Sequence, residues 1–247
     1  MDQVRRRYRA HMQPVGFVSF ECVYRETDLM LAVDEASFSR ELVSFAESRM
    51  LFYRTQLEDY LQLDPLFRLT LEPHLVYAEA PPVALIMARA GNAAGVGPMA
   101  SVAGALAELV GKDLLRQARQ VIVENGGDIF MQVEQSARVS ILAGASRFSE
   151  KVALELPARS EPYGICTSSG TVGPSLSFGK ADAAVIISAS APLSDAVATA
   201  AGNKVQVAAD LPGALEFAKN ISGVEGVLLI KDDKMAAWGN FKLVSCC

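Results

Sequence analysis

Three polar segments carry the residue types that could do chemistry in this 247-residue chain. The first is the turn Asn125, Gly126, Gly127 and Asp128, which follows the predicted strand 121–124. Adjacent glycines reach backbone angles with positive φ, and exposed amides in such a turn can hold a phosphate or another anion beside a carboxylate. The same four residues also fit an ordinary hairpin turn, so both interpretations stay open.

The second segment, 164–180, combines glycines, hydroxyl side chains and one lysine at the end of an apolar run. We expect it to line a cleft for a polar or phosphorylated ligand, with Cys166 supplying a thiol and Lys180 a positive charge. A flexible surface loop is the alternative interpretation. The other residues that we expect to contact the ligand are Ser168, Ser169, Gly170, Thr171 and Ser175.

The third segment holds Asp195 and Thr199, which are four residues apart in a run that predicts a helix. This spacing puts both side chains on one face of the helix. A carboxylate and a hydroxyl, supplemented by backbone carbonyls, form a hard oxygen site for Mg²⁺ or Ca²⁺. Alternatively, Asp195 caps the start of the helix and Thr199 packs against its neighbours.

Histidine, cysteine and glycine spacing exclude other classes of site. The two histidines, His11 and His74, have no Ser, Cys or Asp partner in a triad pattern, so we do not expect a Ser–His–Asp hydrolase. The four cysteines do not have the spacing of a zinc site or a disulfide framework; the pair Cys246-Cys247 is a mobile tail or a redox or metal-binding dithiol. The glycine loop 91–97 does not match G-x-G-x-x-G, which excludes a Rossmann site.

Composition sets the class of protein and its partners. A net charge of −5 argues against a nucleic-acid partner, because binding phosphates requires clustered Lys and Arg. The one basic cluster, at Arg5, Arg6, Arg7 and Arg9, is expected to be a solvated terminus. No run of about twenty apolar residues and no signal peptide is found, so we expect no membrane association and a cytoplasmic location. Half of the residues are apolar, which fills a sizeable core and also allows a homo-oligomer.

The elements that must position the three segments are expected to form one α/β domain over 1–247, an α+β arrangement with a mixed sheet. Asp34 is expected to cap a long helix over 35–62, and His74 to stand at the start of a strand. Further helices are expected at 99–110, 112–119, 193–201 and 213–220. Strands are expected at 15–24, 28–33, 83–89, 121–124, 128–133, 137–143, 150–156, 163–168, 183–189, 225–231 and 234–239.

Four stretches together resemble the ApbE superfamily, and more closely its uncharacterised UPF0280 branch. They are GPMASVAGALAELVG (97–111), VIVENGGDIF (121–130), GICTSSGTVGPSLSFGKADAAVI (164–186) and SDAVATAAGN (194–203). The resemblance implies an ApbE-like single domain with a flavin cleft and a divalent metal such as Mg²⁺, which in the transferases helps to move FMN from FAD to a protein threonine. The pattern of acid, small residues and threonine on the metal helix matches Asp195 and Thr199. The glycine turn of the transferases matches 126–128.

The chain departs from the flavin transferases before the metal helix. Their segment H-I-x-D-P-x-T-G is replaced here by residues 166–180, which we call the Ser/Gly loop. This replacement argues against FAD binding and FMN transfer. Relatives carry His where this chain has Pro174, so no general acid or base is expected at that position. The UPF0280 branch is also associated with anaerobic sulfide assimilation to homocysteine from aspartate semialdehyde, which implies that Cys166 is a sulfur carrier or nucleophile.

Three functions therefore remain open at the level of sequence. The chain is an enzyme or accessory factor of sulfur metabolism acting on a small metabolite, a flavin transferase or flavin-binding protein, or a non-catalytic binding or scaffold protein. Whether it is an enzyme at all is left open by the residues alone.

Overall fold

A long antiparallel sheet forms the middle layer of the computed structural model, which describes residues 9, 14–171 and 177–246. Its strand order is β1-β2-β3-β4-β7-β8-β9-β10. Two-residue turns join β1 to β2, β3 to β4 and β9 to β10, whereas longer segments make the other connections. Each strand pair in the described residues is antiparallel. The strands are β1 Phe17–Tyr24, β2 Thr27–Asp34, β3 Val121–Asn125, β4 Asp128–Gln132, β7 Tyr163–Ser168, β8 Ala183–Ser188, β9 Val224–Lys231 and β10 Lys234–Gly239.

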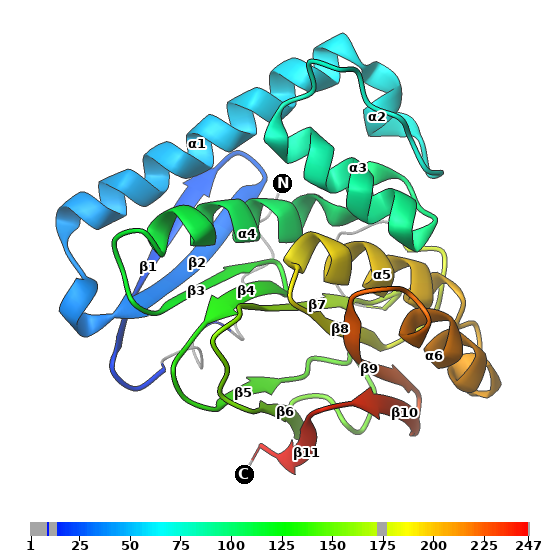
Figure 1. Cartoon of the computed structure of the whole chain (residues 1–247). Helices are drawn as coiled ribbons and strands as arrows, with labels where there is room; N and C mark the ends of the chain where they lie inside the picture. Colours follow the sequence, from blue (N-terminus) through cyan, green and yellow to red (C-terminus); the bar gives the residue numbers. More distant parts are fainter. Residues whose placement is uncertain (1–8, 10–13, 172–176, 247) are drawn as a thin grey trace.

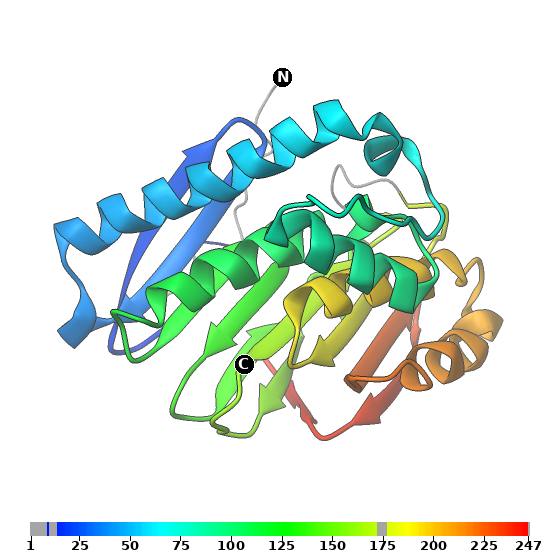
Figure 2. The ribbon, with the colours of Figure 1, turned by 45° about the horizontal axis from the view of Figure 1, so that its top comes forward.

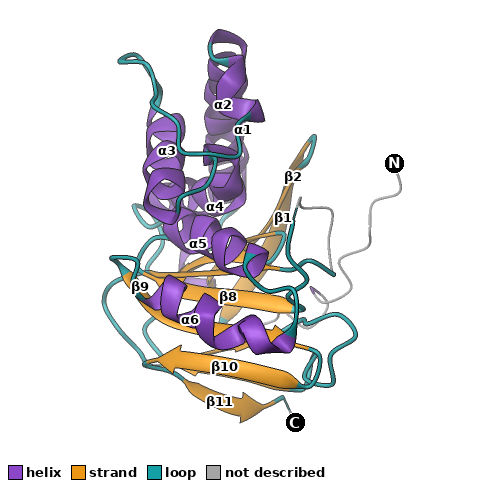
Figure 3. Ribbon diagram, turned by 90° about the vertical axis from the view of Figure 1, so that its right-hand side faces the viewer, coloured by secondary structure: helices purple, strands orange, loops and turns teal. Residues whose placement is uncertain are grey.

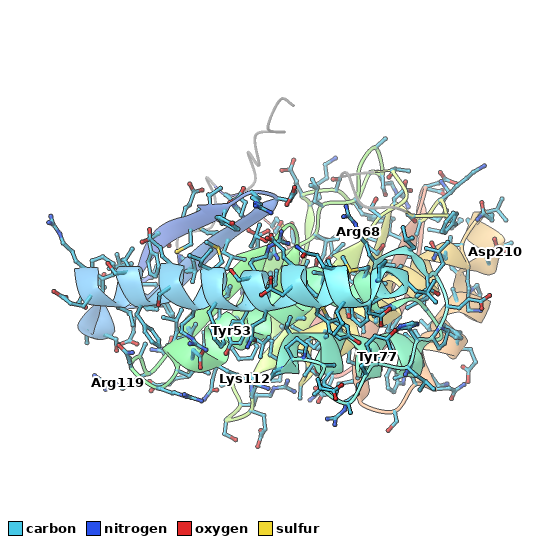
Figure 4. The ribbon with its side chains drawn as sticks, turned by 90° about the horizontal axis from the view of Figure 1, so that it is seen from above. Tyr53, Arg68, Tyr77, Lys112, Arg119 and Asp210 are labelled. Atoms are coloured by element: carbon cyan, nitrogen blue, oxygen red, sulfur yellow. The ribbon has the colours of Figure 1, made fainter. Side chains whose placement is uncertain are left out.

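The helices cover one face of this sheet, as Figures 1 and 3 show. Helices α4 and α5 lie directly on the central strands, while α1 and α3 pack over them and α6 covers β9 and β10 (Figure 2). Seen from above, α1 runs lengthwise from the side of the molecule where Arg119 lies, and Asp210 lies beyond its other end (Figure 4). The helices are α1 Arg40–Leu63, α2 Pro65–Leu69, α3 Pro82–Ala94, α4 Val102–Leu114, α5 Ala191–Asn203 and α6 Leu211–Lys219, with short 3₁₀ turns η2 Glu35–Ser37, η3 Pro98–Ser101 and η4 Ala208–Asp210.

A second, three-stranded sheet covers the opposite face. It has the order β11-β6-β5, with bounds Lys242–Ser245, Val152–Leu156 and Ala137–Ser140. Apolar side chains fill the space between the two sheets, among them Ile165 of β7, Leu154 of β6 and Leu228 of β9. The central strand β8 is buried along its whole length because it is covered on both faces.

The α+β class predicted from sequence is confirmed, but the expected mixed sheet is wrong, because every strand pair of the described residues is antiparallel. The long connection from β2 to β3 passes through α1–α4 and returns in the antiparallel direction. The expected strand at 83–89 is also wrong, because these residues belong to α3. Its buried positions, which include Val83, Met87 and Ala94, recur at helical spacing, and a short apolar run does not distinguish a buried strand from a buried helix.

The expected break in the helices near residue 111 is absent, because Gly111 lies inside α4 and not at its end. A Cβ atom on Gly111 would lie 2.2 Å from the Phe130 ring, so the glycine allows α4 to approach β4 closely. The separate helix expected at 112–119 is therefore the last turn of α4 followed by a turn. Asp34 does not cap α1 either; Ser39 does, through a 3.1 Å hydrogen bond from the Leu42 amide. His74 lies in an irregular segment and not at a strand start.

In the part of the chain that the structure describes, no single helix has the length and hydropathy to cross a membrane. The bent pair Pro82–Ala94 and Pro98–Leu114, which turns by 103°, meets the length and composition criteria only when its two halves are joined.

Candidate functional site

The glycine turn is a two-residue hairpin loop between β3 and β4, in which Asn125 pairs with Asp128. Gly126 and Gly127 have φ of 69° and 104°, the left-handed region that this kind of turn requires. The turn is tied to its surroundings at both sides. The Glu124 carboxylate accepts a 2.7 Å hydrogen bond from the Gly127 amide, and the Asn125 side chain donates to the carbonyl of Ala103 in α4 at 3.2 Å.

Asp128 opens β4 at the point where β7 ends. The register Ile129↔Ile165 places Asp128 beside Cys166, and its carboxylate accepts a 3.3 Å hydrogen bond from the Thr167 amide. Asp128 is only 8% exposed, so the predicted turn delivers its carboxylate to the interior of the fold. The Gly127 amide is not available to bind an anion, because it already donates a hydrogen bond to the Glu124 carboxylate.

Asp195 reaches the same place from the first turns of α5. Its carboxylate accepts a 2.9 Å hydrogen bond from the Gly104 amide at the start of α4. Burial, and then the nearby negative charge of Asp128, raise the pKa of Asp195 well above its usual value, while the amides of Gly104 and Ala103 oppose this shift. The two carboxylates therefore repel each other, and the Asp195 side chain is partly buried. We call Asp128, Cys166 and Asp195 the acidic cluster.

Small residues make this approach of α4 and α5 possible. A Cβ atom on Gly104 would lie 2.5 Å from the Ala191 carbonyl oxygen and 3.0 Å from the Asp195 Cβ. On the other side, a Cβ on Gly164 of β7 would lie 2.4 Å from the Ala191 amide nitrogen. That amide donates a 2.7 Å hydrogen bond to the Glu108 carboxylate of α4, which fixes where α5 begins. Glycine and a buried carboxylate therefore set the position of the helix that carries Asp195.

Thr199 lies one turn after Asp195 on α5, and both side chains are partly buried on the same helix face, as the spacing predicts. Farther along, a Cβ on Gly202 would lie 3.7 Å from the Ser168 hydroxyl oxygen at the end of β7. Helix α5 therefore runs along β7, with Asp195 near the level of Cys166 and Gly202 near Ser168. Among the described residues, no group of three or more His, Cys, Asp or Glu side chains is placed to hold a metal ion. A divalent cation would therefore take the two carboxylates together with hydroxyl and backbone oxygens, which suits Mg²⁺.

Cys166 is fully buried, and its thiol donates to the carbonyl oxygen of Ala191 at 3.2 Å. Burial, followed by the charges of Asp128 and Asp195, raises the pKa of the Cys166 thiol well above its usual value. Reactive cysteines have the opposite surroundings, which are electropositive and partly exposed. The catalytic role assigned to Cys166 stays a prediction, and its contacts favour the neutral thiol.

The rest of the Ser/Gly loop leads away from the acidic cluster. Ser169 and Thr171 bond to each other, and the Thr171 hydroxyl donates to the Asp182 carboxylate at 3.2 Å. Gly170 follows the same path, since its amide donates to the Ala181 carbonyl at 2.9 Å. The Lys180 side chain is exposed. The predicted ligand residue Ser175 and the position of Pro174 lie outside the described residues.

Two hollows of the surface lie elsewhere. One, of about 290 Å³, is lined by residues that include Arg159, Tyr163 and Glu225. The other, of about 300 Å³, is lined by residues that include Arg147, Asp182 and Asp233. The second hollow shares Asp182 with the Ser/Gly loop, whereas the residues of the acidic cluster line neither.

Sequence reasoning missed several residues that hold the site. The expectation that Arg9 is solvated is wrong, because it is only 7% exposed and bonds to Glu124; Arg5, Arg6 and Arg7 lie outside the described residues. The carboxylate partner of His74 was also missed, although a histidine–carboxylate pair alone does not form a triad. Its Nε2 lies 2.8 Å from the buried Asp64 carboxylate, ten residues earlier in the chain. Tyr60 also donates to Asp64, so this group ties the segment after α2 to the end of α1.

Comparisons with known proteins identify relatives of the chain. The sequence profile of the family described as "AbpE bacteria" matches residues 9–235. A UPF0280 protein of Methanosarcina acetivorans is 39% identical over 217 residues, which cover 87% of this chain and 84% of that protein. A UPF0280 protein of Methanocella arvoryzae is 44% identical over 187 residues, which cover 75% of this chain and 76% of that protein.

Solved structures share the fold at low sequence identity. The flavin transferase ApbE from Vibrio cholerae superimposes with a TM-score of 0.53 at 14% identity and covers 94% of this chain and 97% of its own. The apo flavinyl transferase ApbE of Pseudomonas stutzeri gives a TM-score of 0.53 at 15% identity, with 93% and 94% coverage.

Proposed function

The chain belongs to the UPF0280 family of ApbE-like proteins, and on that premise we propose that it binds a flavin nucleotide through a divalent cation at the acidic cluster. The observation that carries this proposal is the convergence of Asp128 and Asp195. They come from β4 and α5, 67 positions apart, and the charge of Asp128 raises the pKa of Asp195. A divalent cation relieves this repulsion, and hard carboxylate oxygens are the ligands that Mg²⁺ prefers.

The surroundings of Asp195 support a cation at this site. Within the described part of the chain, Asp195 forms no ion pair, and its contacts are the amides of Gly104 and Ala103. Thr199 presents a hydroxyl one helical turn away. A bound cation would supply positive charge for the phosphate groups of a nucleotide. The chain's own residues would orient it, because Gly104 and Glu108 fix α5 and the hairpin fixes Asp128.

The choice of a flavin nucleotide rests on the solved flavin transferases that share the fold. In the corresponding reaction, the hydroxyl of an acceptor threonine forms a bond to the phosphorus of FMN. The pyrophosphate bond of FAD breaks, AMP leaves, and the hydroxyl proton is released. This chain does not contain the H-I-x-D-P-x-T-G segment, so binding is proposed ahead of transfer.

The experiment has two stages. Titration calorimetry with FAD is carried out in the presence of Mg²⁺ and again with a chelator, and the proposal expects binding only with the cation. The complex is then incubated with a threonine-containing acceptor peptide, and mass spectrometry detects covalent FMN. A chain that binds neither FAD nor FMN with Mg²⁺ present would remove the flavin proposal.

Sulfur transfer is the second candidate, and it comes from the UPF0280 resemblance. It would make Cys166 a nucleophile in homocysteine synthesis, which requires an accessible thiolate. The burial of Cys166 and the raised pKa of its thiol favour the flavin proposal over this one. The test is the replacement Cys166→Ser in cells that depend on the protein for homocysteine. Unchanged homocysteine synthesis in these cells would contradict the sulfur-transfer role.

A cytoplasmic location and a homo-oligomer stay predictions. Cell fractionation checks the location, and light scattering checks the oligomeric state.

A further inference from the structure

Arg9 enters the fold although its neighbours in sequence suggest a solvated basic terminus. Its side chain is only 6% exposed. The guanidinium Nε donates to the Glu124 carboxylate at 2.7 Å, and Nη1 donates to the Asp28 carboxylate at 2.6 Å. A third bond joins Nη2 to the Asp28 carbonyl oxygen at 2.8 Å. The planar, forked guanidinium makes these bonds in a fixed geometry that a lysine ammonium does not reproduce.

Glu124 passes this contact on to the glycine turn. One carboxylate oxygen accepts from Arg9, and the other accepts from the Gly127 amide at 2.7 Å. Glu124 is 1% exposed, so water has little access to replace a hydrogen bond that its carboxylate loses. Gly127 precedes Asp128, the first member of the acidic cluster, by a single peptide bond. A chain of two hydrogen bonds therefore connects the N-terminal segment to the candidate cation site.

We propose that Arg9 is a positioning residue for the Gly126-Gly127 turn, that it acts through Glu124, and that it thereby sets the affinity of the acidic cluster for a divalent cation. The part that concerns the cation rests on the proposed function. An Arg9 variant lacks the donor that fixes one Glu124 carboxylate oxygen, so the carboxylate is held less firmly and its bond to the Gly127 amide weakens. The hairpin then fixes the position of Asp128 less tightly.

Two measurements on four proteins test this role. The wild type is compared with Arg9→Ala, with Arg9→Lys, and with Arg25→Ala as the control. Arg25 also forms an ion pair, with Glu58, but it is exposed and lies far in sequence from the turn. Amide hydrogen exchange reports the protection of the Gly127 amide, and Mn²⁺ titration followed by electron paramagnetic resonance reports the cation affinity.

We expect Arg9→Ala to raise the exchange rate of the Gly127 amide at least tenfold, while amides of the central strand β8 exchange as in the wild type. We also expect the Kd for Mn²⁺ to rise about tenfold. Arg9→Lys keeps the positive charge without the forked guanidinium, so its exchange rate and its Kd should lie between those of the wild type and Arg9→Ala. Arg25→Ala should match the wild type in both quantities. A merely structural role would lower the melting temperature and leave the Mn²⁺ affinity of the folded protein unchanged, which would overturn the proposal.

The two readouts separate this inference from the function on which it rests. If the wild type does not bind Mn²⁺, the proposed function fails, and the exchange of the Gly127 amide alone decides whether Arg9 positions the turn. Unchanged exchange in both Arg9 variants overturns the positioning role, whatever the metal result. If Arg9→Ala does not fold, Arg9→Lys carries the test, with at least threefold faster exchange expected and an unchanged rate counting against the proposal.

Discussion

Replacing Gly104 by alanine should force α4 and α5 apart and destabilise the protein. The new Cβ would lie 2.5 Å from the Ala191 carbonyl oxygen, about 0.9 Å short of the 3.4 Å at which ordinary contact begins. Because the contacted atoms belong to the backbone, no side-chain rotation relieves the overlap. Such overpacking costs about 3 kcal/mol at the upper end of its usual range, and the helix propensity of alanine returns about 1 kcal/mol. The net loss of unfolding free energy is therefore about 2 kcal/mol.

Thermal unfolding of matched variants measures this loss. In a chain of this size, about 2 kcal/mol lowers the melting temperature by roughly 4–8 °C. Gly213→Ala is the control, because Gly213 also lies in a helix, α6, and a Cβ there would meet nothing within 4 Å. It should melt at or slightly above the wild-type temperature. A Gly104→Ala protein that melts as high as the wild type would refute the close-packing argument and the position of Asp195 that depends on it.

Three further predictions concern the site itself. Iodoacetamide should label Cys246, which is exposed, and spare Cys166 in the native protein; rapid labelling of Cys166 would contradict its burial. The folded protein raises the pKa of Asp195, so the protonated carboxyl favours folding. This contribution to the unfolding free energy is fully present below the pKa of Asp195 in the unfolded chain, about 3.9. It is lost as the pH rises through the higher pKa of the folded protein. Asp195→Asn should therefore gain stability relative to the wild type from pH 4 upward in denaturant titrations, and a pH-independent difference would contradict the raised pKa. Gly127→Ala, at φ of 104°, should lower the unfolding free energy by about 1–3 kcal/mol in the same titrations, and an unchanged value would refute the strain.

Local features of the site could be predicted from sequence because short segments determine them. Two glycines after an apolar run specify a hairpin turn, and the structure has that turn at Gly126-Gly127. The four-residue spacing of Asp195 and Thr199 specifies a shared helix face, which α5 provides. The resemblance to the ApbE superfamily brought the segments together as one site before any distance was known.

Long-range contacts could not be predicted in this way. Arg9 and Glu124 are 115 residues apart, and nothing in the basic run around Arg9 distinguishes a buried guanidinium from a solvated one. The same holds for Glu108 and the Ala191 amide, 83 residues apart. The strand expected at 83–89 failed for another reason, since a short apolar run carries no period that separates a buried helix from a buried strand.

Titration with Mg²⁺ tests directly whether Asp195 helps to bind a divalent cation. Titration calorimetry with Mg²⁺ compares the wild type, Asp195→Asn and Asp233→Asn, the last being a control at an exposed carboxylate on the surface. We predict that the wild type and Asp233→Asn bind one Mg²⁺ with the same affinity and that Asp195→Asn weakens binding at least tenfold. Equal Mg²⁺ binding by all three proteins, or no binding by the wild type, would contradict a cation site at the acidic cluster.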